Sequence, residues 1–161
     1  MQRGGFLTQS DREALDRFPP KIDVDDLRRC FWLGEHDCRE VVELRYGPAA
    51  RLAGGLQLGA LRLLGFVPTD LSTAPGEVVD YVVDYVAAQV DATATDLAAY
   101  TTRVKTRYEH GDAVAYVLGF RRSGDLKALG DWLVERAMEH DRPMLLFRLA
   151  CDHLRSERIL R

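Results

Sequence analysis

Apolar residues recur every three or four positions along most of the chain, and this spacing is typical of amphipathic helices. Strand signals are weak by comparison. Proline, glycine and capping residues divide the pattern into predicted helices over residues 11–18, 23–33, 37–46, 49–64, 75–90, 99–118, 125–140 and 143–159. The sequence therefore predicts an all-α fold.

Residues at the ends of these helices support the division. Ser10 and Glu13 have the spacing of a capping box for the first helix, and Asp23 can cap the second. Pro48 follows Gly47 at a position where proline commonly begins a helix. Gly119 ends the long helix over residues 99–118.

The helix over residues 49–64 is rich in small residues, among them Gly54, Gly55 and Gly59. Each glycine inside a helix costs about 1 kcal/mol. Such positions allow another helix or a ligand to approach the backbone closely, and we favour close helix packing. A connector with Pro68 follows at residues 65–74. We therefore expect two small units similar to helix-turn-helix domains, over residues 1–67 and 68–161.

The chain has 161 residues with a net charge of −3, so a globally basic nucleic-acid binder is excluded. Its three cysteines form no CxxC pair, which fits a reducing compartment. We find neither a signal peptide nor an apolar run of membrane-spanning length. These features predict a soluble cytoplasmic protein that does not bind a membrane.

Although the net charge is negative, the chain contains two basic segments. Residues 45–65 carry three arginines and no acid, whereas residues 66–99 carry six acids and no base. Residues 100–122 then carry five bases against two acids. Local positive charge is what phosphate binding requires, although a charged helix face is most often merely solvated.

The second basic segment contains a more specific pattern. Four side chains recur at a spacing of three and four and share one helical face: Arg103, Thr106, Arg107 and His110. Guanidinium groups there can donate to phosphate or to guanine. The alternative is a surface network in which Glu109 pairs with Arg103 or Lys105.

Several blocks of sequence follow one another in a particular order. They are Phe6-Leu7-Thr8, Leu52 to Gly65 with Gln57-Leu58 at its centre, Phe66-Val67-Pro68, Ala74-Pro75 to Gln89, Tyr100 to His110, and Arg142 to Ala150. In this order and separation the chain resembles the N-terminal region of Tn3-family transposases, from about Phe6 to its C-terminus.

The resemblance implies helical domains that bind the terminal inverted repeats of a transposon as double-stranded DNA. It also implies that catalysis belongs to an RNase H-like domain, with an Asp-Asp-Glu triad and two divalent metals, beyond the end of this chain. We therefore expect no enzyme activity and no cofactor for the chain alone. Further expected partners are a second copy or a full-length transposase.

We predict a recognition helix from Arg103 to Leu118 in the second unit. The DNA contacts predicted there are Arg103, Lys105, Thr106, Arg107, His110, Arg121 and Arg122. In the first unit they are Arg45, Arg51, Gln57 and Arg62. The alternative function is a helical protein–protein interaction module that regulates a full-length transposase, which the acidic segment and the valine-rich helix over residues 75–90 would suit.

Other chemistry finds little support. The four histidines and three cysteines have no metal-ligand spacing, so we expect no metal site. Neither a Gly-x-Ser-x-Gly elbow nor a phosphate-binding glycine loop occurs. Trp32 and Trp132 are expected to fill the core.

Overall fold

The computed structural model describes residues 8–86, 97, 100, 104–122, 124 and 127–161. Its elements are α1 (Gln9–Leu15), α2 (Val24–Phe31), α3 (Glu35–Asp37), the π-helical turn η1 (Cys38–Val42), α4 (Pro48–Leu64), the 3-10 turn η2 (Leu71–Thr73), α5 (Gly76–Val86), α7 (Val104–Val117), β1 (Arg121–Arg122), α8 (Lys127–Ala137), α9 (Pro143–Ser156) and β2 (Ile159–Leu160). The fold is all-α, as predicted. In the described residues its only sheet is the short parallel pair β1–β2, which the sequence analysis missed.

Local signals predicted several helix ends to within one or two residues. The helices predicted over residues 37–46 and 143–159 are shorter in the structure, which has α3 with η1 at the first and ends α9 at Ser156. The Asp23 carboxylate accepts from the backbone N–H of Asp25 at 2.8 Å, and Pro48 begins α4. The prediction for α1 was wrong: Thr8, not Ser10, is the cap. The Thr8 hydroxyl accepts from the Asp11 N–H at 3.1 Å, and the Asp11 carboxylate accepts from the Thr8 N–H at 2.9 Å. This capping box has the same spacing as the predicted one and lies two residues earlier.

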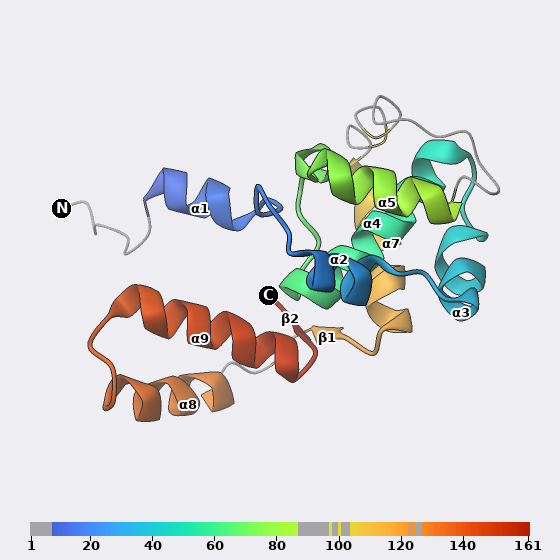
Figure 1. Ribbon diagram of the computed structural model, residues 1–161. Coiled ribbons are helices and arrows are strands. Elements are labelled where there is room, and N and C mark those ends of the chain that lie inside the picture. Colours follow the sequence, from blue (N-terminus) through green and yellow to red (C-terminus); the bar gives the residue numbers. More distant parts are fainter. Residues whose placement is uncertain (1–7, 87–96, 98–99, 101–103, 123, 125–126) are drawn as a thin grey trace.

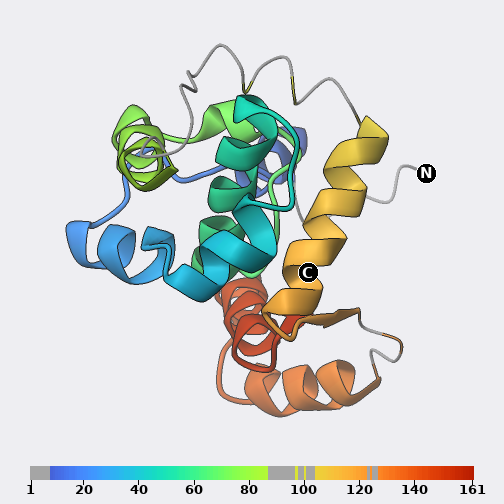
Figure 2. The same cartoon turned by 90° about the vertical axis from the view of Figure 1, so that its right-hand side faces the viewer.

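Helix α4 forms the centre of the core. It packs against α2, η1, α5 and α7, and every residue from Leu52 to Leu61 is buried. Figures 1 and 2 show these helices gathered around it. Because α4 is covered on all sides, it carries apolar or small residues around nearly its whole circumference.

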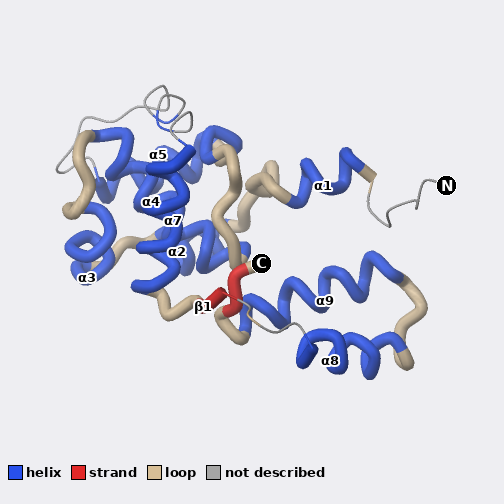
Figure 3. The backbone as a smooth tube through the Cα atoms, turned by 180° about the vertical axis from the view of Figure 1, so that it is seen from behind, coloured by secondary structure: helices blue, strands red, loops and turns tan. Residues whose placement is uncertain are grey.

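Helices α8 and α9 form a hairpin that lies to one side of this core (Figures 1 and 3). The division into binding units at residues 1–67 and 68–161 stays a prediction. In the structure, α4 from the first range packs against α5 and α7 from the second, so the core is continuous across residue 67.

The glycines of α4 allow the close helix packing that the sequence predicted. A Cβ added to Gly59 would lie 2.1 Å from Cδ1 of Phe31, a fully buried ring on α2. No side chain fits between these two helices at that point. Gly65 ends α4 in the left-handed conformation with φ of 76°.

The two tryptophans do not fill the core as expected. Trp32 is 53% exposed, because α2 ends at Phe31 and the chain turns there so that Leu33 enters the interior instead. Trp132 is half-buried and stacks on His153 of the neighbouring helix, with ring centroids 4.3 Å apart.

Within the described ranges, none of the helices combines the length and the apolarity that crossing a membrane demands.

Replacing Gly59 with alanine tests the α2–α4 contact. Overlap with Phe31 should lower the free energy of unfolding by about 1–3 kcal/mol, even though alanine favours a helix. The matched control is Gly130→Ala on α8, where nothing lies within 4 Å of an added Cβ. That change should raise stability by about 0.5–1 kcal/mol. Urea unfolding of both variants measures the difference, and equal stabilisation would contradict the packing described.

Candidate nucleic-acid interface

Arg45 follows η1, and its guanidinium lies in the interior with 6% of the residue exposed. It donates to three acceptors: Nε to the Val41 carbonyl at 2.8 Å, Nη1 to Oε1 of Gln57 at 3.0 Å and Nη2 to the His110 carbonyl at 3.0 Å. Gly54 makes room for it, since a Cβ there would lie 3.0 Å from Nε. Arg45 thus links η1, α4 and α7.

Gln57 is fully buried at the centre of α4. Its Nε2 donates to the Tyr100 hydroxyl and to the Arg107 carbonyl, both at 3.4 Å. The same hydroxyl lies 2.9 Å from Nδ1 of His110, and the rings of Tyr100 and His110 stack with centroids 5.8 Å apart. The Gln57 block and the Tyr100–His110 block are far apart in sequence but meet inside the protein. We call the hydrogen-bonded group of Arg45, Gln57, Tyr100 and His110 the interior network.

Burial shifts the pKa values in this network toward the neutral forms. Desolvation lowers the pKa of Arg45 and raises that of the Tyr100 hydroxyl. Desolvation also lowers the pKa of His110, and the nearby positive charge of Arg45 lowers it further. The network therefore favours a neutral imidazole beside the cation.

One face of α7 packs against the interior network and is therefore shielded from solvent. Arg107 is only 8% exposed, and Thr106 and His110 are half-buried. Lys105 is exposed and pairs with Glu109 at 3.8 Å, which is the surface pairing that the sequence left open. Arg103 lies outside the described residues.

Two further predicted contacts also bind within the protein. Nε of the half-buried Arg51 donates to the Arg45 carbonyl at 3.1 Å. Arg62 holds both carboxylate oxygens of Asp37, at 2.9 and 3.0 Å, and donates to the Trp32 carbonyl at 3.0 Å. Both arginines therefore fix the chain around α3 and η1.

Arg121 and Arg122 form the strand β1, beside Ile159 and Leu160 of β2. Both side chains are exposed. Arg122 donates to both carboxylate oxygens of Asp112 at 2.8 Å, whereas the side chain of Arg121 bonds to no described residue. Among the predicted site residues that the structure describes, Arg121 therefore combines an exposed side chain with the absence of a described partner.

Three more arginines, which precede or follow β2, lie near Arg121 and Arg122 of β1. Arg155 donates to the Leu63 carbonyl at 2.6 Å, Arg158 to the Leu118 carbonyl at 3.1 Å, and Arg161 to the Leu15 carbonyl. These carbonyls lie at the C-terminal ends of α4, α7 and α1, where the helix dipole favours a cation. We name the five residues the junction cluster: Arg121, Arg122, Arg155, Arg158 and Arg161.

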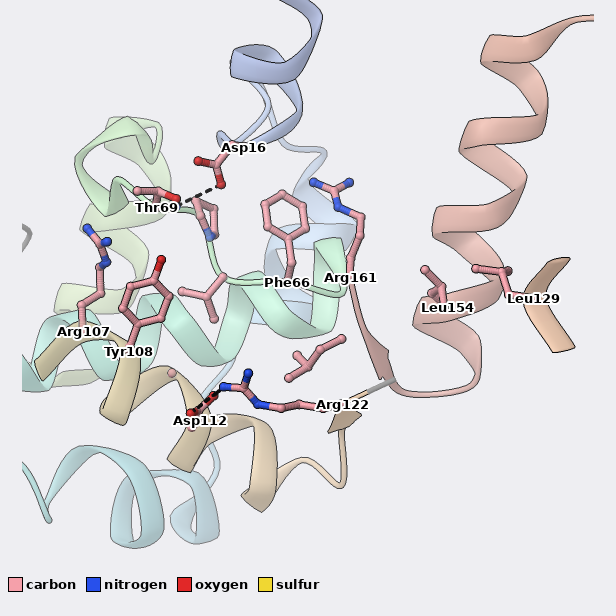
Figure 4. A pocket seen from close by; sticks show the side chains of 14 residues that line it. Asp16, Phe66, Thr69, Arg107, Tyr108, Asp112, Arg122, Leu129, Leu154 and Arg161 are labelled. Carbon is pink, nitrogen blue, oxygen red and sulfur yellow. Dashed lines mark hydrogen bonds and ion pairs between the residues drawn. The ribbon is translucent and has the colours of Figure 1, made fainter. Parts of the chain in front are cut away.

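A cavity of about 770 Å³ lies beside the junction cluster, between the core and the hairpin. Figure 4 shows Arg107 and Tyr108 on one side of it and Phe66 with Arg161 on the other. The Arg161 guanidinium carbon lies 3.7 Å from the centre of the Phe66 ring. Cationic and aromatic groups thus line one hollow together with two acids, Asp16 and Asp112.

In the described ranges, no three His, Cys, Asp or Glu side chains lie together in a way that could hold a metal ion.

Residues 6–161 match a protein family described as a domain of unknown function, DUF4158. The chain belongs to the DUF4158 family. It is also 31% identical to the transposase for transposon Tn501 from Pseudomonas aeruginosa, over 98% of this chain. Transposases for Tn21 from Escherichia coli and for gamma-delta from Escherichia coli K12 are each 29% identical, over 99% and 96% of this chain.

The chain spans 16% of the length of each of these relatives. This DUF4158 chain is thus homologous to the N-terminal region of Tn3-family transposases, and the resemblance seen in the sequence blocks is confirmed.

The structure of this DUF4158 member gives several of the predicted contacts an interior position, and it brings three arginines that the sequence analysis did not single out into the junction cluster. Arg45, Gln57 and Arg107 are buried, so we leave them out of the interface proposed below. The missed residues are Arg155, Arg158 and Arg161. Their only signal in the sequence is a cation at every third position, and nothing local indicates the distant carbonyls that they bind.

The lowered pKa of His110 predicts a dependence of stability on pH. The unfolded chain takes up a proton near the ordinary pKa of 6.5, while the folded chain resists it. Stability should therefore be full above that pKa and fall as the pH drops through it. His110→Gln should flatten this fall in urea unfolding measured from pH 7.5 to about 5. His36→Gln, at an exposed site, serves as the control and should leave the profile unchanged.

Proposed function

We propose that this chain is the end-binding part of a Tn3-family transposase and binds the terminal inverted repeats as double-stranded DNA. Catalysis then belongs to the remainder of the transposase. The homology supports the assignment, because the relatives are named transposases and the chain covers one region of their length. The junction cluster is the observation that carries the DNA-binding proposal.

The charges around the junction cluster favour phosphate. Five arginines gather there, and Asp112 and Asp152 each pair with one of them, Arg122 and Arg155. Exposed ion pairs of this kind contribute little, so a phosphate can replace the carboxylate at small cost. Positive charge therefore remains available in a chain that is acidic overall.

Several of these arginines are already held in place. Each of Arg155, Arg158 and Arg161 uses one part of its guanidinium on a backbone carbonyl. A guanidinium has five N–H donors, so others remain for a ligand. A fixed guanidinium loses less side-chain entropy on binding than a free one.

Helix α7 leads directly into the junction cluster and is the proposed recognition helix. Its exposed side chains include Lys105, Tyr108 and Tyr116. The interior network holds α7 on α4 through its backbone carbonyls, which would fix its angle in a major groove. Lys105 and Thr106 remain proposed contacts on this helix. Arg103, which lies outside the described residues, remains a proposed contact as well.

Fluorescence anisotropy with duplexes of the terminal inverted repeat tests the proposal. Affinity should fall steeply as salt rises, since bound phosphates release counterions. A shuffled duplex of equal length should bind more weakly at every salt concentration. Equal binding of both duplexes would refute sequence specificity, and no binding at low salt would refute DNA binding.

Arg121→Ala should weaken this binding roughly threefold to tenfold and lower the salt slope by about 1, as expected for one lost phosphate contact. The side chain makes no described contact, so folding should be unaffected. Arg142→Ala is the matched control, because Arg142 is exposed at the opposite end of α9. The same loss in both variants would indicate a general charge effect and would exclude the junction cluster as the contact.

A further inference from the structure

The cavity beside the junction cluster has the size of a small-ligand site. Its volume is about 770 Å³, and ligand pockets in proteins commonly measure about 300–1,000 Å³. Its apolar lining comes from elements far apart in the chain: Val67 and Pro68 after α4, Leu129 of α8, Leu154 of α9 and Leu160 of β2. We name it the junction cavity, because it lies where the hairpin meets the core.

Aromatic rings stand on two sides of the junction cavity, as Figure 4 shows. Tyr108 of α7 is 60% exposed, so much of its side chain is not used in packing. On the other side, the Arg161 guanidinium lies over the Phe66 ring, with its carbon 3.7 Å from the ring centre. Nucleobases stack on aromatic rings and on guanidinium planes. Both walls therefore suit a flat ring.

One edge of the junction cavity suits a phosphate group. Arg122 of the junction cluster lines it and donates to both carboxylate oxygens of Asp112 at 2.8 Å. The two side chains are exposed, and an exposed ion pair is easily exchanged. A guanidinium offers a phosphate the same pair of parallel donors that it offers a carboxylate.

Another edge of the junction cavity is acidic. Asp16, just after α1, lines it, and Oδ1 of Asp16 accepts from the Thr69 N–H at 3.2 Å. Its other oxygen accepts from no described residue. Guanine presents a ring N–H and an amino group on its pairing edge, which a carboxylate can accept. In a duplex this edge is already paired, so the acid favours an unpaired base.

We propose that the junction cavity binds a nucleotide whose base is unpaired. The base lies between Tyr108 and the stacked Phe66 and Arg161. Asp16 accepts from its pairing edge, and Arg122 binds its phosphate. An acidic peptide would meet repulsion from Asp16 and would leave the aromatic walls unused.

The nucleotide can come from solution or from a DNA strand, because the chemistry is the same. The second source rests on the proposed function, since the flanking phosphates of the strand would then lie on the junction cluster. The tests below first measure the binding of a single nucleotide and then separate the two sources.

Isothermal titration calorimetry with deoxyguanosine monophosphate (dGMP), deoxyguanosine and inorganic phosphate tests the site. The chain should bind dGMP more tightly than either part alone. Tyr108→Ala should weaken dGMP binding roughly fivefold or more, as for one lost stacking contact, whereas Tyr108→Phe should retain it. Tyr46→Ala is the matched control, because Tyr46 is 98% exposed and does not line the cavity.

Three results would overturn the proposal. They are no binding of dGMP, equal affinity for dGMP and inorganic phosphate, and equal loss of dGMP affinity in Tyr108→Ala and Tyr46→Ala. Circular dichroism checks that each variant keeps its helix content.

Two further variants separate the ends of the ligand. Arg122→Gln should weaken dGMP binding about tenfold, the loss expected for a charged hydrogen bond, and should leave deoxyguanosine unaffected. Asp16→Ala should reduce the preference for dGMP over thymidine monophosphate, since thymine has no amino group. An equal effect of Arg122→Gln on dGMP and deoxyguanosine would contradict the phosphate position.

Duplexes of the terminal inverted repeat separate the two sources. One is fully paired, and the others carry a single unpaired guanine at each position in turn. If a DNA strand supplies the nucleotide, one position should bind more tightly than the paired duplex, and Tyr108→Ala should remove the difference. Equal binding of all duplexes, with dGMP still bound, assigns the cavity to a free nucleotide. The dGMP titration contains no duplex, so its failure is distinguishable from a failure of duplex binding.

Discussion

The fold depends on a buried cation that has no carboxylate partner among the described residues. Burying a charge costs several kcal/mol unless its donors are satisfied. Arg45 meets that cost with acceptors from three elements: the Val41 carbonyl of η1, Gln57 of α4 and the His110 carbonyl of α7. The Gln57 and His110 acceptors are in place only when α4 and α7 are packed beside η1. The network therefore couples the register of α7 to that of α4, and the helix proposed to contact DNA takes its orientation from Arg45 and Gln57.

The helices could largely be predicted, because their signals are local. Asp23, Pro48 and Gly65 act within a few residues of their own positions. The interior positions of Arg45, Gln57 and Arg107 could not be predicted in this way, because a guanidinium or an amide has the same chemistry at a surface as in an interior. Gln57 did carry a hint: it lies among apolar and small residues on every side of its helix. A polar residue in such surroundings is better interpreted as an interior hydrogen-bonding group.

The C-terminal arginines show a second limit of sequence reasoning. Arg155, Arg158 and Arg161 find their acceptors 92, 40 and 146 residues away along the chain. No periodicity encodes such partners, because they exist only once the ends of α4, α7 and α1 have been brought together. The strands β1 and β2 escaped prediction for the same reason, as each has two residues and depends wholly on the other.

The same physical rule explains how an acidic chain can offer a basic surface. The C-terminal end of a helix carries partial negative charge on its free carbonyls. Where the ends of several helices meet, that charge attracts cations from distant parts of the sequence. Arg155, Arg158 and Arg161 each satisfy one such carbonyl and keep further N–H donors on the guanidinium. Net charge is then a poor guide to binding, since the fold gathers arginines at one place and leaves many of the acids elsewhere. The structural and the proposed DNA-binding roles of these arginines consequently rest on one arrangement of helix ends.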